Sequence, residues 1–127
     1  MPGPHLIIYS EAEELANRLT HGIAALLSVV GLVVLLLAAS RTGDPYRIVS
    51  SAVFCSVLSL FYIISTLYHT FRNQRVRYVF RILDHAGIFL VIAASYTPFT
   101  LVSLREGNGW ALFGVVWGLA IGGTVFK

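Results

Sequence analysis

Titratable side chains stand at the ends of long apolar segments, where a membrane makes them costly to bury. His21 opens one segment, His69 nearly closes the next, and Asp84 opens the third. Polar, titratable groups at bilayer depth usually mark a functional site. If consecutive segments cross in opposite directions, these three positions lie near one face of the membrane. Imidazole and carboxylate groups are accepted zinc ligands, so the pattern favours a metal-linked site.

Further polar residues share helix faces with the two histidines. Glu14, Asn17 and His21 are spaced i, i+3, i+7, which places them on one stripe of a helix. Ser65 and His69 are spaced i, i+4 and also share a face. Groups of this kind orient metal ligands from outside the coordination shell. We therefore predict that they support the site.

Each of these residues also has an explanation that needs no site. Glu14 could be solvated just outside the membrane, and His21 could bond a neighbouring backbone carbonyl. His69 could lie in the aromatic belt at the interface. Asp84 could pair with Arg81 at i, i+3 on its own helix. The site hypothesis depends on the residues occurring together at one depth, rather than on any one of them.

The elements that must position these groups are membrane helices. The chain has 127 residues, of which 57% are hydrophobic and 12% charged, against about 25% charged in a soluble domain. Four segments without Asp, Glu, Lys or Arg cover 19–40, 48–71, 86–104 and 107–126, each near the ~20 residues that span a bilayer. In lipid such segments form helices. We predict an all-α integral membrane protein with one domain, 1–127, and helices about 11–40, 47–72, 80–104 and 108–126.

The distribution of arginine predicts the topology. The segment 72–81 carries Arg72, Arg75, Arg77 and Arg81 and no acid, so the positive-inside rule makes it cytoplasmic. Two helices separate it from the N-terminus, which is then cytoplasmic too, in the plasma membrane. The arginines form no basic face with interleaved aromatic residues, so nucleic acid is not an expected partner.

Local signals mark the helix ends and one kink. Ser10 and Glu13 fit a capping box, so the first helix should begin near Glu11, before the membrane. The segment 41–47 contains Gly, Asp and Pro and predicts a turn. Pro98 lies inside the third apolar segment and should kink its helix, because proline removes a backbone donor.

A glycine stripe runs along the last segment. Gly114, Gly118 and Gly122 repeat every fourth residue, and small residues at this spacing let another helix approach closely. We interpret the stripe as a packing site within the helix bundle. The alternative is a seam between copies of the chain, which would make the protein a homo-oligomer.

Four motifs, taken together and in this order, resemble the hemolysin III family, the bacterial relatives of the progestin and adipoQ receptors. They span most of the chain, from Glu11 to about Phe126. The motifs are Glu14-x-x-Asn17-x-x-x-His21-Gly22, Ser65-Thr66-Leu67-Tyr68-His69, Leu83-Asp84-His85 and Ser95-Tyr96-Thr97-Pro98-Phe99.

The resemblance implies a seven-helix bundle, of which this chain would form the first part, and a zinc ion near the cytoplasmic face. It implies that His69 is a direct zinc ligand and that Asp84 acts through a bound water, which Asp84 could hold or deprotonate. Ser65 would lie beside the site as a second candidate catalytic residue. The Glu14, Asn17 and His21 stripe would be supporting structure or a proton relay.

One departure from the family pattern concerns the remaining zinc ligands. Relatives complete the site with a His-x-x-x-His pair on the last helix, and this sequence has only His5 and His85 besides the histidines above. We expect the chain to be a fragment that ends at Lys127, about four helices into seven. Its zinc site would be incomplete without further ligands.

Three functions follow from the resemblance. The first is a zinc-dependent hydrolase of lipid amides in the complete protein, with membrane lipid as the substrate. The second is a pore-forming cytolysin, which the family name implies. The third is a receptor that senses membrane lipid. Lipid turnover, membrane leakage and lipid binding without turnover would separate them.

Overall fold

The computed structural model describes residues 8–126 and contains only helices over that range. The helices are α1 (Glu11–Thr42), α2 (Pro45–Tyr68), α3 (Gln74–Pro98), the short π-helix η1 (Phe99–Ser103) and α4 (Gly109–Phe126). Over the described residues, α1, α2 and α4 are each long and apolar enough to cross a membrane, and α3 together with η1 forms the remaining span of four. The predicted all-α membrane class with four spanning helices is confirmed, whereas the seven-helix bundle stays a prediction.

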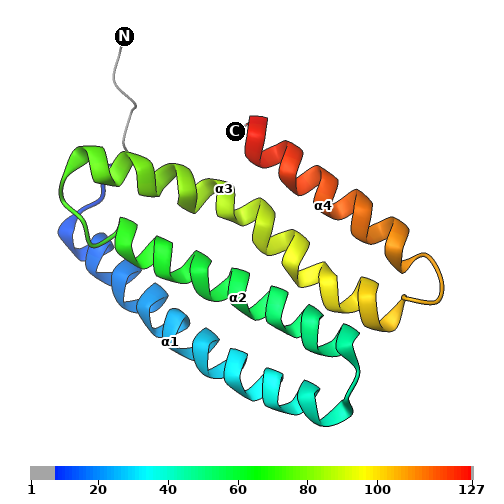
Figure 1. Cartoon of the computed structure of the whole chain (residues 1–127). Helices are drawn as coiled ribbons and strands as arrows, with labels where there is room; N and C mark the ends of the chain where they lie inside the picture. Colours follow the sequence, from blue (N-terminus) through cyan, green and yellow to red (C-terminus); the bar gives the residue numbers. More distant parts are fainter. Residues whose placement is uncertain (1–7, 127) are drawn as a thin grey trace.

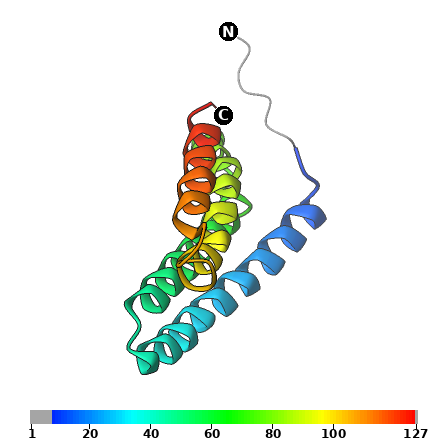
Figure 2. The same ribbon diagram turned by 90° about the vertical axis from the view of Figure 1, so that its right-hand side faces the viewer.

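The helices form an open antiparallel row (Figure 1). Each helix packs on its neighbour in the sequence, α1 on α2, α2 on α3 and α3 on α4. Seen along the row, α1 diverges from the others toward its N-terminal end (Figure 2). This order places the start of α1, the end of α2 and the start of α3 at one end of the molecule. We call it the histidine end.

The connection between α1 and α2 is short, because residues that favour a helix end and a helix start follow each other directly. α1 begins at the predicted capping box, with Ser10 and Glu13 bonded to each other's backbone N–H. It ends at Gly43, whose φ of 67° lies in the left-handed region that glycine adopts readily. Asp44 then caps α2, with Pro45 in its first turn.

Two helix boundaries differ from the sequence-based expectation. α2 ends at Tyr68 rather than near residue 72, and α3 begins at Gln74 rather than near residue 80. The side chain of Asn73 accepts hydrogen bonds from the N–H groups of Arg75 and Val76, which starts α3 six residues early. Three of the four loop arginines therefore lie on α3.

Pro98 is the last residue of α3, where the helix changes type, and the predicted kink stays a prediction. The chain continues directly into the π-helix Phe99–Ser103. Proline lacks the N–H that an α-helical bond requires, and wider π turns are one way to accommodate the break.

Small residues dominate the buried positions. Ala93, Ala94, Ser50, Ser65 and Thr97 are at most 1% exposed. Small side chains let membrane helices pack closely in the absence of a hydrophobic driving force between them. Large apolar side chains point outward instead, with Leu26 and Leu119 both 71% exposed. This distribution suits helices whose outer faces meet lipid or other helices.

Candidate functional site

Glu14 is the centre of a buried charged network at the histidine end. Its Oε2 lies 2.8 Å from Nδ1 of His69, and its Oε1 accepts a hydrogen bond of 2.6 Å from Nη2 of Arg77. The three side chains are only 16%, 7% and 14% exposed, respectively. The network joins α1, the end of α2 and the first turn of α3.

The contact with Glu14 engages one ring nitrogen of His69 and leaves the other without a hydrogen bond among the described residues. A carboxylate can only accept a hydrogen bond, so Nδ1 of His69 carries a proton and donates a hydrogen bond to Glu14. In the neutral ring the lone pair then lies on Nε2, which makes no hydrogen bond to any residue in 8–126. This is the arrangement by which a carboxylate orients a histidine for metal binding.

His21 lies beside His69 and belongs to a second polar pair. Its Nδ1 is 2.5 Å from the hydroxyl oxygen of Ser65, one turn before His69 on α2. The two imidazole rings meet edge to face, with centroids 5.8 Å apart. The helical spacings found in the sequence thus bring His21, Ser65 and His69 together from two helices.

Aromatic rings enclose the two histidines. Tyr62 packs edge-on against His21, and Tyr9 packs against His69 at 5.6 Å. Tyr68 is 2% exposed, and the guanidinium carbon of Arg77 lies 4.9 Å from the centre of its ring. These rings lower the local dielectric and fix the position of Arg77, because a cation is attracted to an aromatic face.

Asp84 stands apart from the hydrogen-bonded network. Its Oδ1 is buried, yet it accepts no hydrogen bond from any described residue. Buried carboxylate oxygens are normally paired, and an unpaired one calls for a ligand such as an ion or a water.

The remaining predicted residues lie at the margin of the site. The side chain of Asn17 is half-buried and makes no hydrogen bond to residues 8–126. His85 donates from Nδ1 to the carbonyl of Arg81 on its own helix. Gly114, Gly118 and Gly122 have no atom of another described residue within 4 Å of the position that a Cβ would take. The stripe is thus uncovered within the described chain, and its partner stays a prediction.

Arg77 and Tyr9 were not assigned to the site from the sequence, and Tyr68 was named only as part of the Ser65–His69 motif. We interpreted the arginine segment as a topology signal alone. Glu14 could have indicated the missing cation. It lies on the same helix face as His21, and a carboxylate buried there needs a positively charged partner nearby.

The described residues do not form a complete metal site. Among residues 8–126 no three His, Cys, Asp or Glu side chains are close enough to hold a metal ion together. A catalytic zinc takes three protein ligands and a water. The oriented Nε2 of His69 and the unpaired Oδ1 of Asp84 fit such an ion, but they do not complete its coordination.

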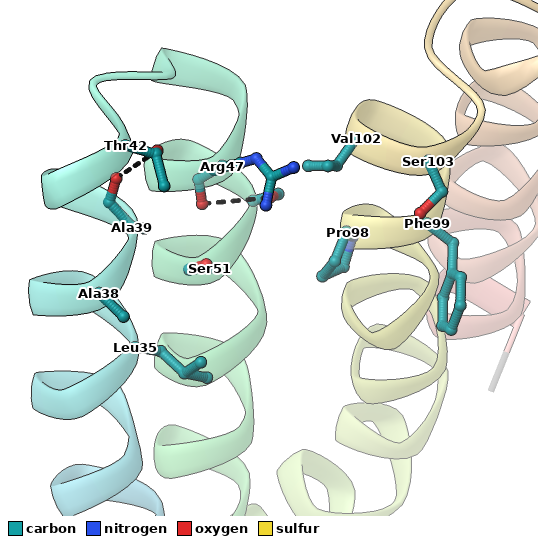
Figure 3. A pocket seen from close by; sticks show the side chains of 11 residues that line it. Leu35, Ala38, Ala39, Thr42, Arg47, Ser51, Pro98, Phe99, Val102 and Ser103 are labelled. Carbon is teal, nitrogen blue, oxygen red and sulfur yellow. Dashed lines mark hydrogen bonds between the residues drawn. The ribbon is translucent and has the colours of Figure 1, made fainter.

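A cavity of about 380 Å³ lies at the end of the helices opposite the histidine end. It is lined by the end of α1, the start of α2, Pro98 and η1, mainly with apolar and hydroxyl side chains. Figure 3 shows Arg47 reaching from α2 toward Val102 on η1. No histidine lines this cavity.

Comparison with known proteins agrees with the motifs. Hemolysin-3 of Bacillus cereus is 45% identical over 115 residues, which cover 91% of this chain and 52% of that protein. The hemolysin-3 homolog of Bacillus subtilis (strain 168) is 41% identical over 120 residues, covering 94% and 56%, respectively. The chain spans about half the length of these curated relatives.

No solved structure matches the chain. The sequence model of the proteins described as "Haemolysin-III related" matches residues 9–127, which include all four helices. The chain belongs to the hemolysin III family.

Proposed function

We propose that the histidine end is a zinc-linked site facing the cytoplasm, and that the complete protein uses it to hydrolyse a lipid amide. The observation that carries the proposal is the contact of Glu14 with Nδ1 of His69, which leaves Nε2 as a free ligand atom. Zinc, when bound, would lower the pKa of a coordinated water and polarise a carbonyl. Ligands beyond this chain would complete its coordination.

The side chains of this chain have separate roles in the proposal. Glu14 holds His69 in one orientation, and Arg77 pairs with the other carboxylate oxygen of Glu14. Asp84 supplies a carboxylate oxygen with no other partner, which suits the binding of a water and the acceptance of its proton. Ser65 fixes the ring of His21 beside His69.

The lipid environment supports the choice of substrate. The site lies at the end of three helices that are long and apolar enough to span a bilayer. Arg72, Arg75, Arg77 and Arg81 lie at the same end, and the positive-inside rule places such a cluster in the cytoplasm. An amide near the headgroups of the inner leaflet would reach the site without leaving the membrane.

Zinc binding and lipid turnover test this proposal directly. The complete protein is dialysed against zinc in detergent, and a fluorescent ceramide in mixed micelles reports hydrolysis. We expect His69→Ala in the complete protein to weaken zinc binding by at least about tenfold, whereas His85→Ala, a matched loss of one imidazole, leaves it unchanged. Equal zinc binding by the complete protein and its His69→Ala variant would exclude the site.

Membrane permeabilisation is the second candidate function. The relatives carry the name hemolysin-3, and the glycine face of α4 is uncovered within residues 8–126 and could bind another copy. Dye leakage from liposomes separates the two functions. Leakage that is unchanged in His69→Ala but lost when Gly118 is replaced by leucine would favour assembly over hydrolysis.

A further inference from the structure

A cavity at the histidine end opens beside His69. It has a volume of about 430 Å³ and is bounded by the start of α1, the α2–α3 connection and Arg77 of α3. Arg18, Arg72 and Arg77 line it together with Glu11 and Glu14. We call it the arginine cavity.

The charges around the arginine cavity do not balance within the described chain. Arg77 is occupied by Glu14 and by the carbonyl of Phe71, to which its Nη1 donates at 3.1 Å. Arg18 and Arg72 form no hydrogen bond or ion pair with any residue in 8–126. Glu14 is committed to two partners, so Glu11 at the exposed rim is the one lining acid left to oppose them.

Apolar side chains border the two arginines. Leu15 is 46% exposed and Phe71 37% exposed, and both line the cavity. Arg18 lies one turn before His21, at the point where the apolar run of α1 begins. Unpaired guanidinium groups beside exposed apolar side chains are expected at the depth where lipid phosphates meet acyl chains.

We propose that the arginine cavity binds a phosphate group through Arg18 and Arg72, the phosphate being that of an anionic phospholipid or of a small phosphate ester. Guanidinium groups bind phosphate oxygens in a bidentate manner, which an ammonium group does not reproduce. In the lipid-bound case, Leu15 and Phe71 contact the first part of the acyl chains. The inference does not depend on zinc, because neither arginine belongs to the His69 network.

Binding of defined lipids to the purified chain tests the proposal. Phosphatidylglycerol and phosphatidylcholine are titrated separately in detergent, and native mass spectrometry counts the lipids that stay bound. We expect the chain to retain phosphatidylglycerol preferentially. In Arg18→Gln/Arg72→Gln we expect about 30-fold weaker apparent affinity for it, from the loss of two arginines at a lipid surface.

The control variant Arg41→Gln/Arg75→Gln removes the same net charge. Arg75 does not line the cavity, although it lies in the same stretch of chain as Arg72 and Arg77, and Arg41 lies at the far end of α1; both are exposed. We expect its affinity to fall by about fivefold at most, because one general surface charge near the lipid is lost. Equal losses in the two double variants would overturn the proposal, as would no loss in either.

A soluble probe identifies the source of the phosphate. Glycerol 3-phosphate is added in competition with phosphatidylglycerol. Failure to compete, together with the loss in Arg18→Gln/Arg72→Gln, assigns the site to the lipid. Competition that is itself lost in that variant assigns the site to soluble phosphate esters. If the parent chain binds phosphatidylcholine and phosphatidylglycerol equally well and glycerol 3-phosphate does not bind, the proposal is overturned in both forms.

Discussion

The two ends of the helix row hold their charges in different ways. At the histidine end, Glu14 binds His69 and Arg77 at 2.8 and 2.6 Å, and all three side chains are at most 16% exposed. At the far end, Asp44 faces Arg47 and Arg105 at 3.6 and 3.5 Å, with exposures between 27% and 54%. The first network joins residues on three helices, whereas Asp44 and Arg47 are three residues apart in one segment.

This difference distinguishes the buried Glu14 network, assembled from three helices, from the exposed ion pairs of Asp44. Taking charges out of water costs free energy that ion pairing rarely returns in full, so a buried network is weak evidence for stability and better evidence for function. Exposed pairs cost little and contribute little. The far end instead depends on a helix cap, a glycine turn and the contact of Arg105 with the ring of Tyr46 at 4.1 Å.

The largest effect is expected from breaking the buried network. Glu14→Ala would leave Arg77 and His69 without their shared partner and should lower the free energy of unfolding by about 3 to 5 kcal/mol. Denaturant titration in detergent, followed by helical circular dichroism, measures this loss. Glu11→Ala is the matched control, because Glu11 lies in the same first turn without an ion pair, and we expect a loss under about 1 kcal/mol. Similar losses would show that the network is not energetically coupled.

The next effect tests whether the far end depends on close backbone packing. A Cβ at Gly109 would meet the carbonyl oxygens of Thr100 and Leu104 inside van der Waals distance, and these are backbone atoms that cannot rotate away. Gly109→Ala should destabilise the chain by about 2 to 3 kcal/mol. Gly118→Ala meets no described atom within 4 Å, so we expect a change within about 1 kcal/mol. Thermal unfolding in the same detergent compares the two, and equal melting temperatures would contradict the close approach.

Periodicity predicted most of the histidine end because its contacts follow helix geometry. The i, i+4 spacing of Ser65 and His69, and the i, i+7 spacing of Glu14 and His21, define faces that must meet once α1 packs on α2. The four helices could be predicted for a similar reason, since long uncharged segments have few alternatives in lipid.

The part that could not be predicted depends on register. Arg77 reaches Glu14 because Asn73 starts α3 early, and that cap was not recognised among the arginines. The unpaired Oδ1 of Asp84 is likewise a property of the fold, since no spacing reveals which oxygen is buried. The uncovered glycine face of α4 could not be foreseen either, because Gly123 rather than the stripe meets Phe89 of α3.

A smaller effect is expected at the cap of α2. The Oδ1 of Asp44 accepts a hydrogen bond of 3.0 Å from the N–H of Tyr46, so Asp44→Ala removes an N-cap along with two exposed ion pairs. We expect a loss of about 1 to 2 kcal/mol, most of it from the cap. Asp44→Ser separates the two contributions, because serine keeps the cap without the charge. It should restore most of the stability, and failure to do so would mean that the ion pairs dominate.

The smallest effect should be the coupling between the exposed partners themselves. A double-mutant cycle with Asp44→Ser and Arg47→Gln isolates the pair from the cap, because serine continues to cap the helix. We expect a coupling energy below about 0.5 kcal/mol, since Arg47 is 54% exposed and the contact is 3.6 Å. The same cycle with Glu14→Gln and Arg77→Gln should give a value several times larger, because both partners are buried. Equal couplings at the two ends would mean that burial does not set the strength of these pairs. The orientation of His69 by Glu14 would then be the remaining difference between the histidine end and the far end.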